Sequence, residues 1–253
     1  MMNLIIWWSG ILLESLVLYR GFRAKILSKY QFFYVYIASL LLADSSLYFI
    51  YTLNRASYEK WNWAAGFLNL VLGCGILLEI FKHVLAPYAG AERFARIAGL
   101  AAFGAIFCFA IFHPVVPDVA KVGARNAALE KDFLTVQAIL LFGILGVVSY
   151  YGIEMGRNLR GMICGYGLCL ATSLMTLALR SYIGPVFNTA WAVIQPIVYM
   201  TSLFVWLIAL WSYHPNPVPD AGIRLEEDYE AFAARTRDMV GAMRTQLVKV
   251  ARS

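Results

Sequence analysis

Charged residues are scarce in this chain. They make up 14% of its 253 residues, whereas a soluble domain carries about 25%, and 61% of the residues are hydrophobic. A soluble fold of this size cannot bury that much apolar surface. The apolar residues also form runs of roughly 20, the length of an α-helix that crosses about 30 Å of hydrocarbon. Because the alternating segments of a transmembrane β-barrel are not visible, the composition predicts an all-α membrane protein.

Motifs for catalysis and for resident cofactors are also missing. The sequence has no Walker-type phosphate loop, no His-Glu-x-x-His helix and no Gly-x-Ser-x-Gly elbow. The last apolar run has no lysine, which excludes a retinal-binding rhodopsin, and the three histidines are not placed to bind haem. The cysteines, Cys74, Cys108, Cys164 and Cys169, lie inside apolar runs, where disulfides and zinc sites are not expected. We therefore expect no enzyme activity, no cofactor and no metal.

Seven apolar runs predict a bundle of about seven transmembrane helices. We place them at residues 4–19, 31–53, 62–86, 95–113, 133–155, 162–183 and 188–212. Lys and Arg gather in the first, third and fifth loops, and positively charged loops stay in the cytoplasm. Residues 1–213 are thus expected to form a bundle in a bacterial inner membrane, with the N-terminus outside and the C-terminus cytoplasmic. The net charge of +6 fits contact with anionic membrane lipids, so nucleic acid is not an expected partner.

The C-terminal part of the chain has a different character. Residues 214–223 contain three prolines and predict a stiff linker, because proline lacks the amide donor of a helix. Residues 224–253 predict a cytoplasmic amphipathic helix, acidic at its start and basic at its end. Its apolar residues recur at steps close to three and four: Leu225, Tyr229, Phe232, Met239, Met243, Leu247 and Val250. Contact with the inner leaflet, a short coiled coil and binding of a cytoplasmic protein partner all stay open.

Polar residues inside the apolar runs mark the candidate site, because a charge at mid-bilayer costs about 2.5–3.5 kcal/mol. Six residues in the outer half or at the midplane form a candidate pocket open to the outside: Asp44, Tyr48, Asn69, Gln137, Arg180 and Gln195. We expect an Asp44–Arg180 pair and irregular backbone at Pro196 and near Gly73 and Gly75. The alternative is that the amides only join helices and that Arg180 extends to the outer interface.

A second polar group falls in the inner thirds of the spans. Its members are Glu14, Glu79, His83, Glu154 and Arg157. Each acid has a base within reach, and the expected pairs are Glu79 with Lys82 or His83, Glu154 with Arg157, and Glu14 with Arg20 or Arg160. The pattern predicts a network that ties helix ends together. A proton-coupling role for Glu14 or Glu79 is the alternative.

Small residues in two of the runs predict close helix crossings. Gly161, Gly165 and Gly167 lie at the opening of the sixth run, and Gly143 and Gly146 lie in the fifth. Such residues let helix backbones approach each other in a membrane. The same pattern forms dimer interfaces, so a homo-oligomer or a larger membrane complex stays open.

The layout resembles the seven-helix sensor modules of bacterial signalling proteins. The chain is also similar to a family of uncharacterised bacterial seven-helix proteins, through Leu12-Leu13-Glu14 in the first run and Glu79 to His83 at the end of the third. This resemblance implies a receptor-like or scaffold-like bundle whose outer pocket binds a ligand and whose tail engages a partner. Two alternatives remain: a small-solute or proton-coupled transporter that uses Asp44 with Glu14 or Glu79, and a non-catalytic structural subunit of a larger complex.

Overall fold

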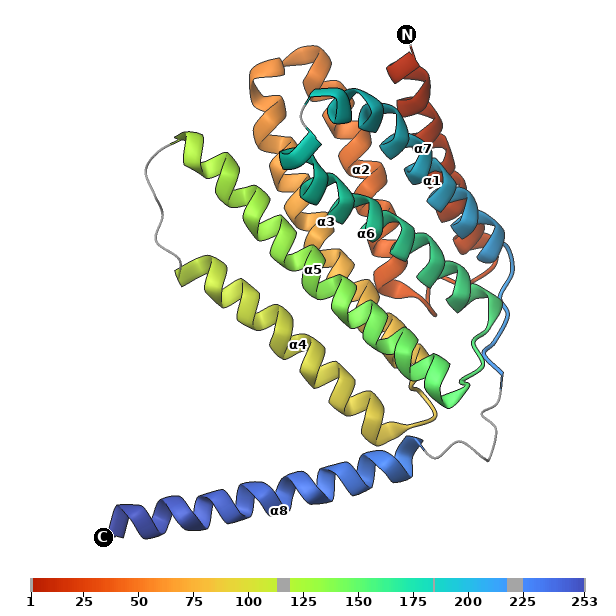
Figure 1. Cartoon of the computed structure of the whole chain (residues 1–253). Coiled ribbons are helices and arrows are strands. Elements are labelled where there is room, and N and C mark those ends of the chain that lie inside the picture. The colour runs from red at the N-terminus through yellow and green to blue at the C-terminus, as the bar shows by residue number, and fades with distance from the viewer. Residues whose placement is uncertain (1, 113–118, 184, 218–224, 253) are drawn as a thin grey trace.

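The computed structural model describes residues 2–112, 119–183, 185–217 and 225–252. Within these ranges the side chains of residues 2–4, 56, 109–112, 119–128, 180–183, 185–190, 192, 242 and 244–252 lie outside the described part. The described residues form eight α-helices and no strand: α1 (Met2–Arg23), α2 (Gln31–Leu53), α3 (Arg55–Val84), α4 (Ala89–Phe112), α5 (Val119–Tyr151), α6 (Arg157–Ile183), α7 (Pro185–Ala209) and α8 (Leu225–Arg252). The expected all-helical bundle is therefore confirmed (Figure 1).

Five helices are long and apolar enough to cross a membrane. They cover Ile5–Arg23, Gln31–Leu53, Ser57–Val84, Leu129–Tyr151 and Arg157–Leu179. The described part of α7 adds a shorter apolar stretch, Val193–Ala209. The first turns of α4 carry Glu92, Arg93 and Arg96, which interrupt its apolar run. Among the described residues, five of the seven expected spans thus have the length and hydropathy that a membrane crossing needs.

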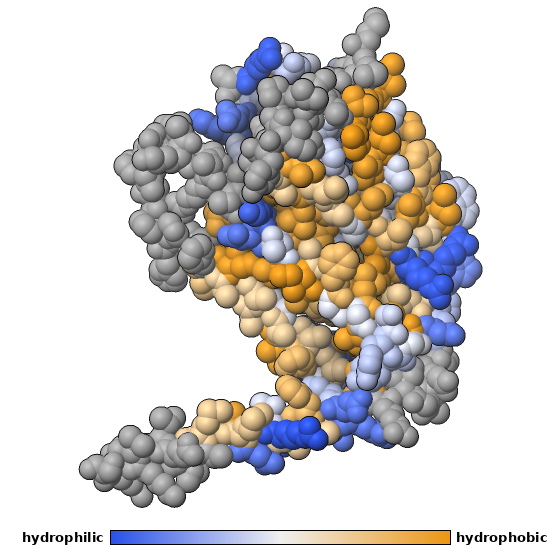
Figure 2. Space-filling model, in the orientation of Figure 1, coloured by the Kyte–Doolittle hydropathy of each residue, from blue (hydrophilic) through white to orange (hydrophobic). Residues whose placement is uncertain are grey.

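The first seven helices pack side by side, and successive helices run in opposite directions (Figure 1). α6 packs mainly on α7 and α2 mainly on α3, while α1 lies against α2 and α7, and α4 lies against α3 and α5. We call the end where α1 begins and α2 ends the upper end, and the end where α2 begins and α8 lies the lower end. Apolar side chains cover much of the described surface on the face that Figure 2 shows, as a lipid-facing bundle requires.

Several helices differ from the expected spans. α3 begins at Arg55 and α5 at Val119, whereas their spans were expected to begin at 62 and 133, because polar first turns continue a helix beyond its apolar part. α3 stays helical through Gly73 and Gly75, and α7 stays helical through Pro196. The expectation of irregular backbone is wrong at Gly73 and Gly75, while at Pro196 the helix continues although proline donates no backbone hydrogen bond. A Cβ at Gly73 would instead overlap Tyr166, and one at Gly75 would overlap Phe32, so these glycines serve close packing.

The fully buried side chains gather toward the lower end. The largest of them include Phe33, Ile76, Leu77, Met162 and Trp206, from α2, α3, α6 and α7. A Cβ at Gly161 would overlap Ala209 and one at Gly165 would overlap the ring of Trp206, so the close crossing expected at these glycines is confirmed and α7 is its partner. At Gly143 and Gly146 an added Cβ would meet no described atom within 4 Å, so these two glycines serve no close crossing among the described residues.

α8 is anchored to the bundle at its first turns and then extends past it (Figure 1). Leu225 is buried, and Glu226 Oε1 accepts a hydrogen bond from the backbone N–H of Gly90 at 2.8 Å. Asp228 Oδ2 accepts one from the Tyr151 hydroxyl at 2.9 Å, and the ring of Tyr229 lies 6.2 Å from that of Phe94. Further along the stripe Phe232, Met239 and Met243 are exposed, while the side chains of Leu247 and Val250 lie outside the described residues.

Candidate functional site

A cavity of about 760 Å³ opens among five helices in the upper half of the bundle. Its polar lining comes from Asp44 on α2, Asn62 and Asn69 on α3, Glu130 on α5, Ser173 and Thr176 on α6, and Gln195 on α7. The indole of Trp63 adds an aromatic wall. The structure thus brings together three of the six residues expected to form a pocket, which are Asp44, Asn69 and Gln195.

Helical spacing explains why α3 contributes so much of this lining. Asn62, Gly66 and Asn69 are four and three residues apart, so they share one face of the helix. Gly66 has no side chain, and an added Cβ would meet no described atom within 4 Å, which leaves the cavity wide at this point. Ser39 Oγ donates a hydrogen bond to Asn69 Oδ1 at 2.9 Å and thereby joins α2 to α3 along the wall.

Asp44 also belongs to a second group, a carboxyl pair with Glu14. The two carboxyl groups, from α2 and α1, lie near enough to interact electrostatically. The hydroxyl of Tyr199 on α7 donates to Glu14 Oε1, while Glu14 Oε2 is buried and accepts no hydrogen bond from a described donor. The Trp7 indole N–H donates to the Asp44 carbonyl at 3.1 Å. Two neighbouring carboxylates repel each other, so a proton or a cation between them would be stabilising.

Glu14 therefore does not lie where the sequence reasoning placed it. It was expected to meet Arg20 or Arg160 at the inner end of its helix. The Arg20 guanidinium instead donates to the Trp211 carbonyl at 2.8 Å and lies 3.7 Å above the Trp211 ring. Side chains on a helix project toward its N-terminus, so Glu14 reaches toward the upper end and Asp44.

The other three expected pocket residues have different surroundings. Tyr48 packs edge to face against Trp7 and Trp8, with ring centroids 5.7 and 5.3 Å apart. Gln137 is buried, where its Nε2 donates to the Leu70 carbonyl at 3.0 Å and its Oε1 accepts from the Tyr166 hydroxyl at 2.8 Å. This agrees with the alternative that an amide joins helices. The side chain of Arg180 lies outside the described residues, so the Asp44–Arg180 pair stays a prediction.

Glu79 binds the main chain at the lower end. Its carboxylate accepts hydrogen bonds from the backbone N–H groups of Phe32 at 3.2 Å and Phe33 at 2.9 Å. These amides belong to the first turn of α2 and have no acceptor within their own helix, so Glu79 caps that helix. His83, one turn further along α3, stacks on Tyr30 with ring centroids 4.7 Å apart. The capping role makes Glu79 a structural residue.

The remaining members of the expected inner network are separate from Glu79. Glu154 is exposed, and the Arg157 guanidinium donates to the Ile208 carbonyl at 2.7 Å. Among the described side chains the one ion pair is Arg96 with Glu92, within α4. The five residues expected to form a single inner network therefore do not form one: Glu14 joins the carboxyl pair, Glu79 and His83 lie at the start of α2, Arg157 binds the end of α7, and Glu154 is exposed.

Sequence reasoning missed several residues of the site. Tyr199 was not singled out, and Glu130 was taken as a loop charge. Helical spacing offered a signal for both. Tyr199 lies four residues after Gln195 and Glu130 seven residues before Gln137, so each shares a helix face with a polar residue already singled out.

Comparison with known proteins gives no relative for this geometry. No family model, no curated protein and no solved structure matches the chain. Its resemblance to bacterial seven-helix proteins and sensor modules stays a prediction. The case for function therefore depends on the cavity and the carboxyl pair.

Proposed function

We propose that the chain is a receptor-like membrane bundle whose upper cavity binds a small organic cation, such as an amine. One observation carries this proposal: Asp44 both lines the cavity and adjoins the buried carboxyl group of Glu14. A bound ammonium group at Asp44 would place a positive charge beside two carboxyl groups that otherwise need a proton between them.

The lining of the cavity favours a cation of this kind. Asp44 and Glu130 bring acidic groups to it, and Trp63, which also lines it, is the kind of side chain that attracts ammonium ions. Asn69 and Gln195 offer hydrogen bonds to polar atoms of the same molecule. The volume of about 760 Å³ falls within the range of roughly 300–1,000 Å³ that small-molecule sites occupy. Among the described side chains no three of His, Cys, Asp and Glu form a metal-binding cluster, which favours an organic cation.

The proposed topology has seven spans, with the N-terminus outside and the C-terminus in the cytoplasm of a bacterium. The supporting observation is the charge at the lower end, where α1, α3 and α5 end and α2, α4 and α6 begin: Arg20, Arg23, Lys25, Lys29, Lys82, Arg93, Arg96, Arg157 and Arg160. Positively charged segments next to spans stay in the cytoplasm. The cavity in the upper half would then be open to the outside of the inner membrane.

The proposed role of α8 is contact with the inner leaflet of the membrane at the cytoplasmic surface. The face that carries the buried Leu225 continues past the bundle as the exposed side chains of Phe232, Met239 and Met243. A helix end that adjoins the bundle and continues with an exposed apolar face suits the surface of the lipid leaflet. Binding of a cytoplasmic protein there stays a prediction.

One observation favours a second candidate, a proton-coupled transporter. The pair of Glu14 and Asp44 can hold a proton that an incoming cation displaces, which is the exchange such a transporter needs. Glu79 has no part in this version, because its carboxylate caps α2. Uptake of a bound amine into proteoliposomes separates the two, since a receptor moves nothing across the membrane.

A thermal-shift screen tests the proposed ligand class. The purified full chain is heated with choline, tyramine, phenethylamine and, as anionic counterparts, benzoate and phenylacetate. We expect at least one of the amines, and neither anion, to raise the melting temperature. Asp44→Asn should weaken that amine about tenfold or more, equivalent to about 1.4 kcal/mol. The exposed Asp132→Asn on α5 is the matched control and should bind normally. Stabilisation by the anions alone, or equal binding by Asp44→Asn, would overturn the proposal.

A further inference from the structure

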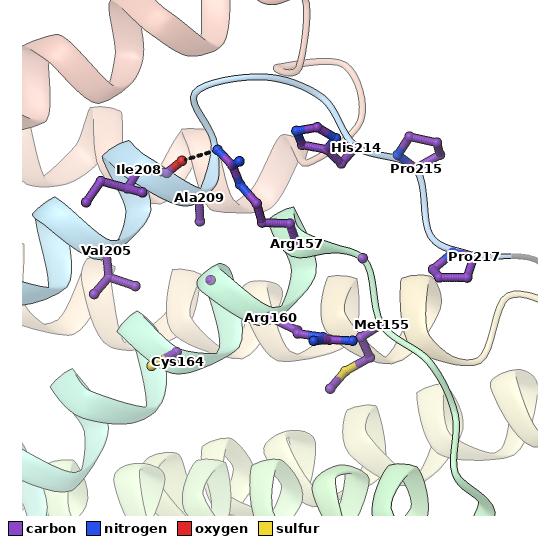
Figure 3. Close-up of a pocket in the computed structure, with 12 residues that line it drawn as sticks. Met155, Arg157, Arg160, Cys164, Val205, Ile208, Ala209, His214, Pro215 and Pro217 are labelled. Carbon is purple, nitrogen blue, oxygen red and sulfur yellow. Dashed lines mark hydrogen bonds between the residues drawn. The ribbon is translucent and has the colours of Figure 1, made fainter.

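A second cavity, of about 820 Å³, lies at the lower end between the start of α6 and the end of α7 (Figure 3). The exit linker that follows α7 closes one side of it, through His214, Pro215 and Pro217. None of the residues of the upper cavity takes part. We call this second cavity the lower groove.

The lower groove has two chemically different parts. Cys164 on α6 and Val205 and Ile208 on α7 give it an apolar wall. Arg157 and Arg160, from the first turn of α6, place two guanidinium groups at its rim (Figure 3). An apolar wall beside a basic rim matches a molecule that has a hydrocarbon chain and an anionic head.

The basic rim is available and is held in place. Among the described side chains the one ion pair is Arg96 with Glu92, so no described acid neutralises Arg157 or Arg160. One Arg157 nitrogen donates to the Ile208 carbonyl at 2.7 Å, which fixes the guanidinium while its other donors remain for a ligand. Guanidinium groups bind phosphate through paired hydrogen bonds, which makes arginine suited to this ligand.

Hydrogen bonds also fix the linker that closes the lower groove. Asn158 Nδ2 donates to the carbonyls of Ala209 at 2.9 Å and Ser212 at 2.8 Å, and Asn158 Oδ1 accepts from the backbone N–H of His214. Asn216 Oδ1 accepts from the Gly156 N–H at 3.0 Å. A site that is formed before its ligand arrives loses less entropy on binding.

The depth of the lower groove places it at the membrane interface. Val193–Ala209 is the apolar stretch of α7, and the lower groove begins at the end of that stretch. Trp211 and Tyr213 follow at once and are exposed, as aromatic residues at the boundary between hydrocarbon and water commonly are. In the proposed topology the rim would therefore lie at the level of lipid headgroups and the apolar wall at the level of acyl chains.

We infer that the lower groove is a binding site for an anionic phospholipid, with its phosphate on Arg157 and Arg160 and an acyl chain along Cys164, Val205 and Ile208. Basic pockets between transmembrane helices at the cytoplasmic side bind such lipids in this way. The site is independent of the proposed amine cavity, so either inference can fail without the other.

Native mass spectrometry of the full chain, released from nanodiscs of phosphatidylglycerol or of phosphatidylcholine, tests this. We expect retained phosphatidylglycerol and little phosphatidylcholine. Arg160→Gln should reduce phosphatidylglycerol retention roughly fivefold, as expected when one basic residue near a lipid surface is lost. Arg93→Gln, an exposed arginine on α4 at the same end, is the matched control and should retain the lipid. Equal retention of both lipids, or equal loss in both variants, would overturn the inference.

Two further arms cover the apolar wall and the source of the phosphate. Cys164→Phe keeps every charge and fills the space along the apolar wall, so it should also reduce phosphatidylglycerol retention. This second variant keeps the inference testable if Arg160→Gln folds poorly. Inorganic phosphate at about 10 mM, a concentration high enough to occupy a weak phosphate site, should not displace the lipid. Displacement of the lipid by inorganic phosphate would show that the lower groove takes free phosphate. Normal retention by Cys164→Phe would show that it binds no lipid chain.

Discussion

The two ends of the bundle use their polar residues differently. At the lower end, buried or half-buried polar side chains bind the main chain: Glu79 accepts from two amides of α2, and Asn158 bonds three backbone groups around the end of α7. In the upper half, Asp44 and Glu14 meet each other, and Asp44 and Asn69 line an open cavity. Groups that satisfy a backbone stabilise a fold, whereas groups left facing a cavity are available to a ligand.

The apolar packing follows the same division. Nearly all of the largest fully buried side chains lie at the lower end, and there the glycines of α6 bring it against α7. The residues lining the upper cavity include Gly66, where an added Cβ would meet no described atom within 4 Å. We therefore expect substitutions at the lower end to change stability, and substitutions in the upper cavity to change binding.

The largest effect should come from Trp206→Ala. The indole is fully buried, packs on Phe33 with centroids 5.2 Å apart and donates to the Met162 carbonyl at 3.3 Å. Removing such a side chain costs about 3–5 kcal/mol. Thermal unfolding in detergent should show the loss, while Phe204→Ala on the exposed side of α7 should change stability little. Equal losses in the two variants would mean that the lower end is not a packed core.

Carboxyl substitutions at the two ends should differ in kind. Glu79→Ala leaves the Phe32 and Phe33 amides without their acceptor and should cost about 1–3 kcal/mol. Glu14→Gln removes an acid from the buried pair yet keeps an oxygen for the Tyr199 hydroxyl, so stability should stay unchanged or rise. Chemical denaturation of both variants measures the difference. A larger loss for Glu14→Gln would contradict the division of roles.

The smallest expected changes in stability come from two glycine substitutions, which can be compared directly. Gly165→Ala forces a methyl group against Trp206 and should destabilise the fold by about 1–3 kcal/mol. Gly143→Ala meets no described atom and removes a flexible residue from α5, so it should be neutral or stabilise by about 0.5–1 kcal/mol. Melting temperatures of the two variants should therefore move in different directions. Loss of stability in Gly143→Ala would indicate a contact between two copies of the chain at α5.

Hydropathy and helical periodicity were enough to predict the helical bundle and three of the seven polar residues that line the cavity. Asp44, Asn69 and Gln195 were chosen because polar side chains inside a membrane cost free energy and are kept mainly where they have a function. All three line one cavity. The partners of these groups could not be predicted in the same way. Glu14 was assigned to the lower end by depth alone, yet the direction of its side chain and the packing of α1 against α2 bring it to Asp44. Pairings across helices depend on rotation about each axis, which one sequence does not specify.

The capping role of Glu79 could not be predicted from the sequence for a related reason. A search for bases near each acid finds Lys82 and His83, because these residues are close in the sequence. The first amides of a neighbouring helix are equally good partners, and they become visible only when α3 is placed beside the start of α2.

Isothermal titration of the full chain with the best amine from the thermal screen tests the central claim most directly. The account predicts saturable binding, about tenfold weaker or more in Asp44→Asn. Titrations in two buffers of different ionisation enthalpy should also show about one proton released per bound amine, and none in Glu14→Gln, because the cation replaces the shared proton. Amine binding that is unchanged by both substitutions, or no binding of any amine to the native chain, would contradict the account.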